Sequence, residues 1–348
     1  MALPSEIDAI LKRGTVIPAH LLALDQDRKF DPRRQRAMTR YYLDAGVGGI
    51  AVGVHATQFA IREVGLYEPV LKLAAETAAA WAARPVVMVA GLSGRTDQAT
   101  KEAEVARGLG YHAGLLSLAA FKGASDDELI EHCRKVSDVM PLVGFYLQPA
   151  VGGRILSSEF WRRFAELENV VAIKIAPFNR YRTLDVVRAV VAARAEDRVS
   201  LYTGNDDHIL LDLVTPYRVW RGNDVVTARI VGGLLGHWSV WVQKAVELLA
   251  RAHVAVANGK IDAEFLALDN RVTDMNQAIF DPQHDFHGCI AGCHEVLRRQ
   301  GILETTHCLD PNESLSPGQA EEIDRVIREN PDLVDDEFVA QNRERWLN

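Results

Sequence analysis

Short apolar segments alternate with longer segments of helical periodicity along the first two thirds of the chain, and this alternation constrains the fold more than any other feature. The apolar runs have the length of strands, and the segments between them repeat apolar residues three and four positions apart, with glycine or proline at the breaks. Successive parallel strands need crossover helices of this kind. Eight candidate strands begin at Thr15, Gly49, Pro85, His112, Leu142, Val170, Val199 and Val231.

Eight β/α units in about 240 residues predict an α/β fold of the (β/α)8 TIM barrel type. An open doubly wound sheet is disfavoured, because no glycine-rich dinucleotide-binding motif follows the first strand. The segment 225–236, which contains the last candidate strand, also fits a helix. After residue 237 the pattern is helical, with helices expected at 238–257, 262–280, 289–300 and 317–329, and a terminal helix or a loose tail from Pro331. We therefore expect a barrel with a short N-terminal lead-in over residues 1–237 and a helical region packed on it over residues 238–348.

Composition narrows the classes of partner. Among the 348 residues, 48% are hydrophobic and 25% are charged, as in soluble globular proteins, and the net charge of −8 is spread without a basic block. These values argue against nucleic acid or an anionic membrane as the partner and favour a small molecule. The sequence has no signal-peptide pattern at its N-terminus and only four cysteines, so we expect a cytoplasmic protein.

Lys174 lies in the apolar run from Val170 to Ala176, where packing alone gives no reason for an ammonium group. On a strand it shares one face with small residues such as Ala172 and Ala176, which leaves room for a ligand beside the amine. A desolvated lysine has a lowered pKa and attacks carbonyl carbons to form a Schiff base. The alternative is a lysine at a strand end that extends to solvent or pairs with a carboxylate.

Strand alternation suggests which side chains share a cavity with Lys174. Gly144, Tyr146 and Gln148 share one face of the preceding strand, which we expect to point into the barrel, so that the Tyr146 phenol could shuttle protons. The alternative is a core tyrosine whose hydroxyl is satisfied locally.

Two further strand ends carry polar residues. His55 follows the second strand as a candidate acid, base or anion contact, and Thr57 opens the loop at the cavity rim. Gly204 and Asp206 follow the seventh candidate strand, where a hydroxylated substrate could be held. The alternative for one of the neighbouring aspartates is an N-cap of the helix that begins near His208.

The residues Gly144-Phe145-Tyr146-Leu147-Gln148-Pro149, followed by Val171-Ala172-Ile173-Lys174, resemble the tyrosine and lysine signature of the dihydrodipicolinate synthase/N-acetylneuraminate lyase family. The similarity extends from about Gly14 to Glu329. It implies a class I mechanism in which Lys174 forms an imine with pyruvate or another 2-oxo acid, while Tyr146 transfers protons and an aldehyde is released or added. It also implies no metal or organic cofactor and a homo-oligomer, either a tetramer or a dimer.

Departures from the family pattern narrow the choice among the activities known in this family. The loop that usually reads Gly-Thr-Thr-Gly-Glu is replaced by residues 53–58, which read Gly-Val-His-Ala-Thr-Gln, and Arg154 is the candidate substitute for the arginine expected after Pro149. In the place where the family has an aromatic pair after the fourth strand, this chain has Ala119-Ala120-Phe121. We therefore expect a lyase, aldolase or dehydratase for another 2-oxo acid, neither a true dihydrodipicolinate synthase nor a true sialic acid lyase. The substrate contacts would be His55, Thr57, Arg154, Gly204 and Asp206.

Two alternatives from other classes remain. The first is a catalytically inactive family scaffold that binds a metabolite, motivated by the altered loop. The second is metal-dependent hydrolysis at a cluster of histidines and cysteines, in which Cys289 and Cys293 share a helix face and His294 is adjacent. Close CxxC pairs are absent, so we favour buried structural cysteines and expect no metal site.

Overall fold

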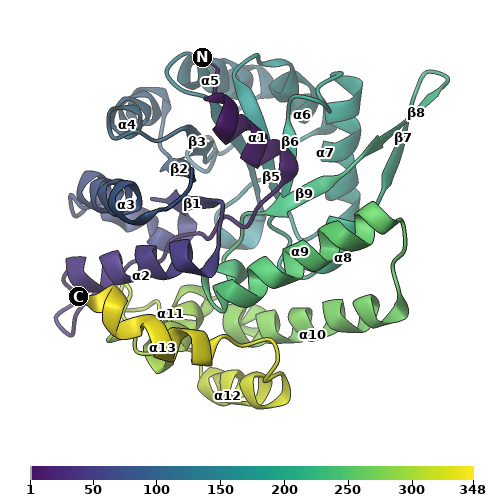
Figure 1. The fold of residues 1–348 in the computed structure, drawn as a ribbon. Coiled ribbons are helices and arrows are strands. Elements are labelled where there is room, and N and C mark those ends of the chain that lie inside the picture. Colours follow the sequence, from purple (N-terminus) through teal and green to yellow (C-terminus); the bar gives the residue numbers. More distant parts are fainter. Residues whose placement is uncertain (1) are drawn as a thin grey trace.

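A curled parallel sheet forms the centre of the computed structural model, which describes residues 2–348 (Figure 1). In this part of the chain the sheet has seven regular strands in the order β1-β2-β3-β4-β5-β6-β9, and every neighbouring pair is parallel. The predicted barrel-type α/β fold is therefore confirmed. The strands are β1 Gly49–Val52, β2 Val87–Leu92, β3 Ala113–Leu116, β4 Leu142–Leu147, β5 Val170–Ala176, β6 Ser200–Thr203 and β9 Ile230–Gly233.

The first predicted strand, beginning at Thr15, is an extended segment with isolated bridges instead of a regular strand. Val16 pairs with Gly233 of β9, and Ala19 pairs with Ala51 of β1. The backbone N–H of Ile17 donates to Gly233 at 2.9 Å, and the N–H of His20 donates to Ala51 at 2.8 Å. Pro18 interrupts the ladder because it has no N–H to donate. The segment nevertheless bridges β9 to β1 and closes the barrel.

Helices cover the outside of the sheet, largely where the periodicity predicts them. Several begin at side-chain caps: the Asp31 carboxylate accepts from two backbone N–H groups, and the Ser157 hydroxyl accepts from the N–H of Phe160. A full capping box joins Ser125 to Glu128. These helices are α2 Pro32–Ala45, α3 Tyr67–Trp81, α4 Thr96–Gly108, α5 Asp126–Ser137, α6 Ser158–Glu166, α7 Arg180–Ala192 and α8 Ile209–Val214.

Two elements differ from expectation. The N-terminal lead-in contains helix α1, Ser5–Arg13, and the Leu11 carbonyl accepts a 2.9 Å hydrogen bond from the Tyr202 hydroxyl inside the barrel. The stretch after α8 forms an antiparallel hairpin of β7, Tyr217–Arg221, and β8, Asp224–Ala228. Because β8 and β9 occupy most of residues 225–236, the helical alternative for this segment is wrong and the strand predicted from Val231 is present. Figure 1 shows the hairpin projecting away from the barrel.

The C-terminal region is helical and packs on the barrel. It contains α9 Val242–Asn258, α10 Ala263–Phe280, α11 Cys289–Arg299, α12 Gln319–Glu329 and α13 Asp336–Leu347. The segment after Pro331 ends in α13, which packs on α2, because the buried Trp346 provides an apolar anchor. The Tyr41 hydroxyl of α2 also donates to Asp335 at 2.7 Å. The division between residues 237 and 238 stays a prediction.

Between residues 2 and 348, no helix combines the length and the apolar character that crossing a membrane requires.

Candidate active site

A cavity lies at the carboxyl ends of the strands, the end of a barrel at which enzymes place reactive groups. Its polar lining comes from four elements: His55 in the short helix η1 (His55–Thr57) after β1, Gln148 after β4, Lys174 on β5, and Asp206 after β6. The cavity volume is about 60 Å³. A water needs about 10–15 Å³ on this measure, so roughly four to six water-sized groups fit.

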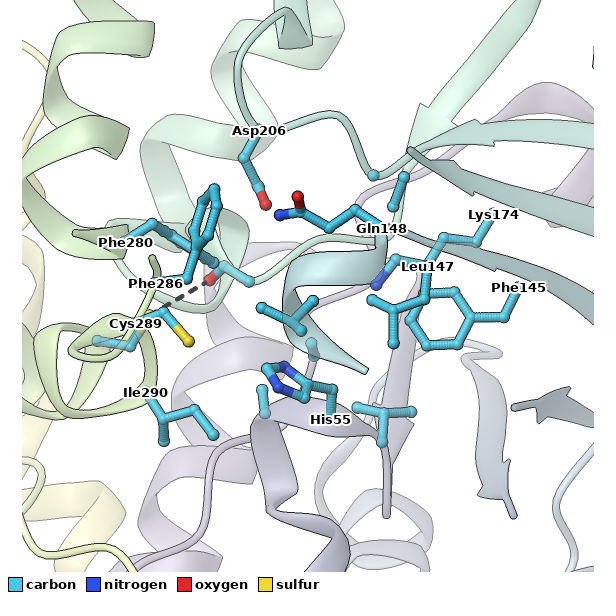
Figure 2. A pocket seen from close by; sticks show the side chains of 18 of the residues that line it. His55, Phe145, Leu147, Gln148, Lys174, Asp206, Phe280, Phe286, Cys289 and Ile290 are labelled. Carbon is cyan, nitrogen blue, oxygen red and sulfur yellow. Dashed lines mark hydrogen bonds between the residues drawn. The ribbon is translucent and has the colours of Figure 1, made fainter. Parts of the chain in front are cut away.

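Lys174 points into this cavity from the small-residue face of β5, as the strand pattern predicts (Figure 2). Only 8% of the residue is exposed, and its Nζ lies 4.5 Å from the ring centroid of Phe145. Burial lowers the pKa of the amine, and the nearby Asp206 partly opposes that shift. A Cβ on Gly204 would lie 2.7 Å from Lys174 Cε, so glycine is required there for the lysine to keep this position.

Asp206 faces the same cavity from the loop after β6. It is 5% exposed, and within residues 2–348 its buried Oδ1 has no hydrogen-bond partner. Burial raises the pKa of the carboxyl group, while Lys174 and a hydrogen bond from the backbone of His237 lower it. The carboxylate is therefore buried, close enough to Lys174 to influence its charge, and free to contact a bound molecule.

A buried polar network holds the loop that carries Gly204 and Asp206. The Asn205 amide donates to Asp212 at 2.9 Å and to Thr183 of α7 at 3.2 Å, and its carbonyl accepts from the N–H of Phe178 at 3.1 Å. The fully buried Asp212 also accepts from Thr203 at 2.6 Å and pairs with Arg180. This network ties the loop to α7 and α8 and gives Asp206 a defined position.

His55 lines the opposite side of the cavity, where Figure 2 shows its ring turned toward the interior. Its surroundings lower the pKa to about 4, mainly through burial and secondarily through the positive charge of Lys174. The imidazole is therefore neutral near pH 7. It can donate or accept a hydrogen bond, but it does not offer a positive charge to an anion.

Tyr146 points away from the cavity, contrary to the predicted face assignment of this strand. Its hydroxyl donates to the Leu156 carbonyl at 3.3 Å, and its ring lies 5.3 Å from that of Trp161 in α6. A Cβ on Gly144 would likewise meet Phe164 and Trp161, so this face of β4 packs on the helix. Phe145 faces Lys174 instead, because it stands in register with Lys174 across the β4–β5 pair.

Comparison with known proteins agrees with the fold. The model of the "Dihydrodipicolinate synthetase family" matches residues 12–216, more than half of the chain. The chain belongs to the dihydrodipicolinate synthetase family. A 4-hydroxy-tetrahydrodipicolinate synthase of Thiobacillus denitrificans is 26% identical over 227 residues, covering 64% of this chain and 72% of that protein. The corresponding enzyme of Desulforudis audaxviator is 25% identical and covers 69% and 79%.

Solved structures of the dihydrodipicolinate synthetase family share the fold. Dihydrodipicolinate synthase from Acinetobacter baumannii, complexed with pyruvate, has a TM-score of 0.74 at 18% identity, covering 91% of this chain and 99% of that one. N-acetylneuraminate lyase from Fusobacterium nucleatum has a TM-score of 0.72 at 16% identity, covering 93% and 100%. At this identity the likeness establishes the fold of the family and leaves the substrate open.

Thr57 lies outside the cavity that contains Lys174, although the sequence places it on the rim. It is fully buried, and its hydroxyl accepts from the N–H of Gly53 at 2.9 Å and donates to the His20 carbonyl at 2.6 Å. Both bonds hold the loop after β1. The expectation that Thr57 contacts a ligand in this cavity is corrected, because its hydrogen bonds are used within the protein.

Arg154 is also separate from that cavity. Its guanidinium donates to the backbone carbonyls of Phe121 at 2.5 Å and Ala124 at 3.0 Å. These bonds fasten the segment after β4 to the segment after β3. Arg154 therefore does not take the place of the family arginine in this structure, because its N–H groups point at backbone oxygens instead of into the cavity.

Two aromatic residues missed by the sequence reasoning contribute to the wall of the cavity. Phe178 and Phe286 both line it, and their ring centroids lie 5.8 Å apart in an edge-to-face pair. Both have a left-handed backbone, with φ of 48° and 65°, which is strained for a bulky side chain. Strand periodicity could not reveal this pair, since the two residues lie in irregular segments far apart in the chain.

The histidines and cysteines that the sequence offered as an alternative metal site are dispersed. Cys289 and Cys293 share a face of α11, as predicted, and that face lines the cavity. His294 is fully buried elsewhere on the helix, with Nδ1 3.3 Å from the Thr306 carbonyl. Across residues 2–348, no group of three His, Cys, Asp or Glu side chains is arranged to hold a metal ion. The small, polarisable side chains of Cys289 and Cys293 instead form part of the cavity wall.

Proposed function

We propose that this protein is a class I lyase, acting as an aldolase or a dehydratase, in which Lys174 forms a Schiff base with a small 2-oxo acid. The position of Lys174 supports the proposal most strongly: its amine is buried at the carboxyl end of a barrel strand, beside an open cavity, with a lowered pKa. Such an amine is neutral in a larger fraction of molecules and is a better nucleophile for a carbonyl carbon. No cofactor is part of this proposal.

Pyruvate is the first compound to consider. Solved relatives of the same fold were obtained with pyruvate, and a cavity of about 60 Å³ accommodates a molecule of that size. Among the described residues that line the cavity, Lys174 supplies the sole positively charged side chain. The acid group of the substrate would therefore depend on hydrogen bonds from His55 and Gln148. An aldehyde partner would enter past the aromatic pair of Phe178 and Phe286.

The same geometry argues that the substrate differs from those of dihydrodipicolinate synthase and sialic acid lyase. Phe145, Leu147 and Phe178 give the cavity an apolar character, which offers few hydrogen bonds to a polyhydroxylated sugar acid. Thr57 and Arg154 are engaged with backbone groups elsewhere. We propose that the second substrate or product is a compact carbonyl compound with an apolar side chain.

A catalytically inactive metabolite-binding protein is the second candidate. One observation favours it: the phenol of Tyr146 is turned into the α6 interface and cannot serve the cavity in this arrangement. The buried amine of Lys174 argues against it, because desolvating a lysine is costly and a binding site gains little from it.

Reductive trapping separates the two candidates. The protein would be incubated with pyruvate and with a panel of 2-oxo acids in the presence of borohydride, and intact mass and peptide mapping would locate any adduct. A reduced adduct on Lys174, absent from Lys174→Met, is expected for the lyase. Folded protein that gives no adduct with any member of the panel would favour the binding scaffold.

Assembly and location are part of the proposal. We expect a homo-oligomer, either a tetramer or a dimer, which sedimentation velocity would test. All four cysteines are free and buried, which fits a reducing cytoplasm. Fractionation of the source cells would test the location.

A further inference from the structure

Proton transfer in this cavity needs a group other than a phenol. Imine formation and enamine chemistry each require a proton donor and a proton acceptor beside the substrate. Tyr146 is packed against α6, and Phe145, which faces Lys174, has no exchangeable proton. Within the described chain, the titratable side chains that line the cavity are His55, Lys174, Asp206, Cys289 and Cys293.

Three of these five groups fit the task poorly. Burial raises the pKa of the Cys293 thiol and raises that of Cys289 to about 12, so both stay protonated. His55, with a pKa of about 4, is a weak base near neutral pH. Lys174 is consumed by bond formation to the substrate. Asp206 is the group that remains.

The position of Asp206 suits an acid and base. Its carboxylate faces the interior from the β6 loop, while the Lys174 amine enters from β5, and Figure 2 shows Gln148 pointing toward Asp206. Among the described residues, Lys174 and Asp206 form no ion pair, and both line the same cavity, so a carbonyl compound bound there would lie beside both groups. The unpartnered Oδ1 of Asp206 is available to that compound, and the Asn205 network prevents the loop from moving it away.

We infer that Asp206 is the proton donor and acceptor of this site, occupying the role that a phenol would otherwise fill. The inference rests on the proposed Schiff-base function and adds the residue that moves the protons. The same desolvation that lowers the pKa of Lys174 raises that of Asp206, so burial favours the neutral form of both groups. The neutral pair is one amine and one carboxylic acid, which is the form that attack requires.

The proton balance is complete without another reactant. The neutral amine of Lys174 attacks the carbonyl carbon, and after proton shifts the carbinolamine hydroxyl takes the proton of the Asp206 acid and leaves as water. The product is a protonated imine beside an Asp206 carboxylate. That carboxylate then removes a proton from the carbon next to the imine, giving the neutral enamine and the Asp206 acid. Return of the proton to carbon reverses the step.

Exchange of the pyruvate methyl protons for deuterium tests this inference, because it requires no knowledge of the second substrate. Wild type and Asp206→Asn would be incubated with pyruvate in deuterium oxide and followed by proton NMR, and the adduct would be trapped with borohydride in parallel. We expect Asp206→Asn to retain the Lys174 adduct and to lose exchange by about 10²-fold or more. Asp206→Ser is a second variant for which the same loss is expected.

Asp207→Asn is the matched control, since Asp207 is the adjacent carboxylate and lies exposed outside the cavity lining. It should exchange like wild type. If Asp206→Asn is trapped and exchanges within about threefold of wild type, the inference is overturned while the Schiff-base proposal stands. If folded wild type gives neither adduct nor exchange, the proposed function itself fails, and the role of Asp206 fails with it.

Discussion

Replacing Tyr146 with phenylalanine should leave the chemistry of the cavity intact and weaken the fold slightly. The phenol makes two long hydrogen bonds to Leu156, donating to its carbonyl at 3.3 Å and accepting from its N–H at 3.4 Å. The ring contact with Trp161 persists in the variant. Without the hydroxyl, the N–H and the carbonyl of Leu156 both lose this partner. We therefore expect the free energy of unfolding to fall by about 1–2 kcal/mol.

The expected shift in melting temperature follows from chain length. Unfolding entropy averages about 2.1 cal/mol/K per residue, or roughly 0.7 kcal/mol/K for this chain, so the loss corresponds to about 1–3 °C. Calorimetry would measure the shift, while borohydride trapping and methyl exchange would measure the chemistry, both expected within twofold of wild type. A roughly 10²-fold loss of exchange with an unchanged melting temperature would refute this reasoning, because it would mean that the phenol reaches the substrate.

Two further predictions concern space around Lys174 and the effect of acid. Gly204→Ala should slow trapping at Lys174 by at least about tenfold and lower the free energy of unfolding by about 1–3 kcal/mol, because the new Cβ would approach Lys174 Cε to 2.7 Å. Gly108→Ala is the control: its new Cβ would meet nothing within 4 Å, so this variant should be trapped normally. Equal trapping rates in the two variants would contradict the argument. Burial lowers the pKa of His20 to about 4, below the ordinary value of 6.5, so the unfolded chain binds the proton more readily. His20 should therefore contribute stability in full above pH 6.5 and lose roughly 3 kcal/mol of it as the pH falls to 4. Urea unfolding across this range should show a shallower pH dependence for His20→Gln, and an unchanged slope would count against the buried neutral imidazole.

Local sequence pattern was sufficient for the architecture and for the position of Lys174. Alternating apolar runs and amphipathic segments specify strands and helices from neighbouring residues alone, and their order leaves few topologies for a parallel sheet. Lys174 was identifiable for the same reason: a charged residue within an apolar strand contradicts its surroundings, and the small residues on its face indicated an open space.

The face of β4 could not be read in the same way. Period-two alternation says that Phe145 and Tyr146 point to opposite sides, but it does not say which side is inward. That choice depends on the register with β5, which shifts between Leu142 and Val143, and on Trp161 of α6, which receives the tyrosine ring. Family resemblance in linear sequence favoured Tyr146, whereas packing against the helix selected Phe145 for the cavity.

The sequence by itself determined a barrel of β/α units with a lysine on the inward face of one strand, because both are encoded by short-range pattern. The tertiary structure decided what surrounds that lysine. Asp206 is aimed by a network through Asn205 and Asp212, and Cys289 reaches the cavity from a helix that follows the barrel in sequence. These contacts join residues from separate elements, and their geometry exists only once the barrel has closed and the C-terminal helices have packed against it.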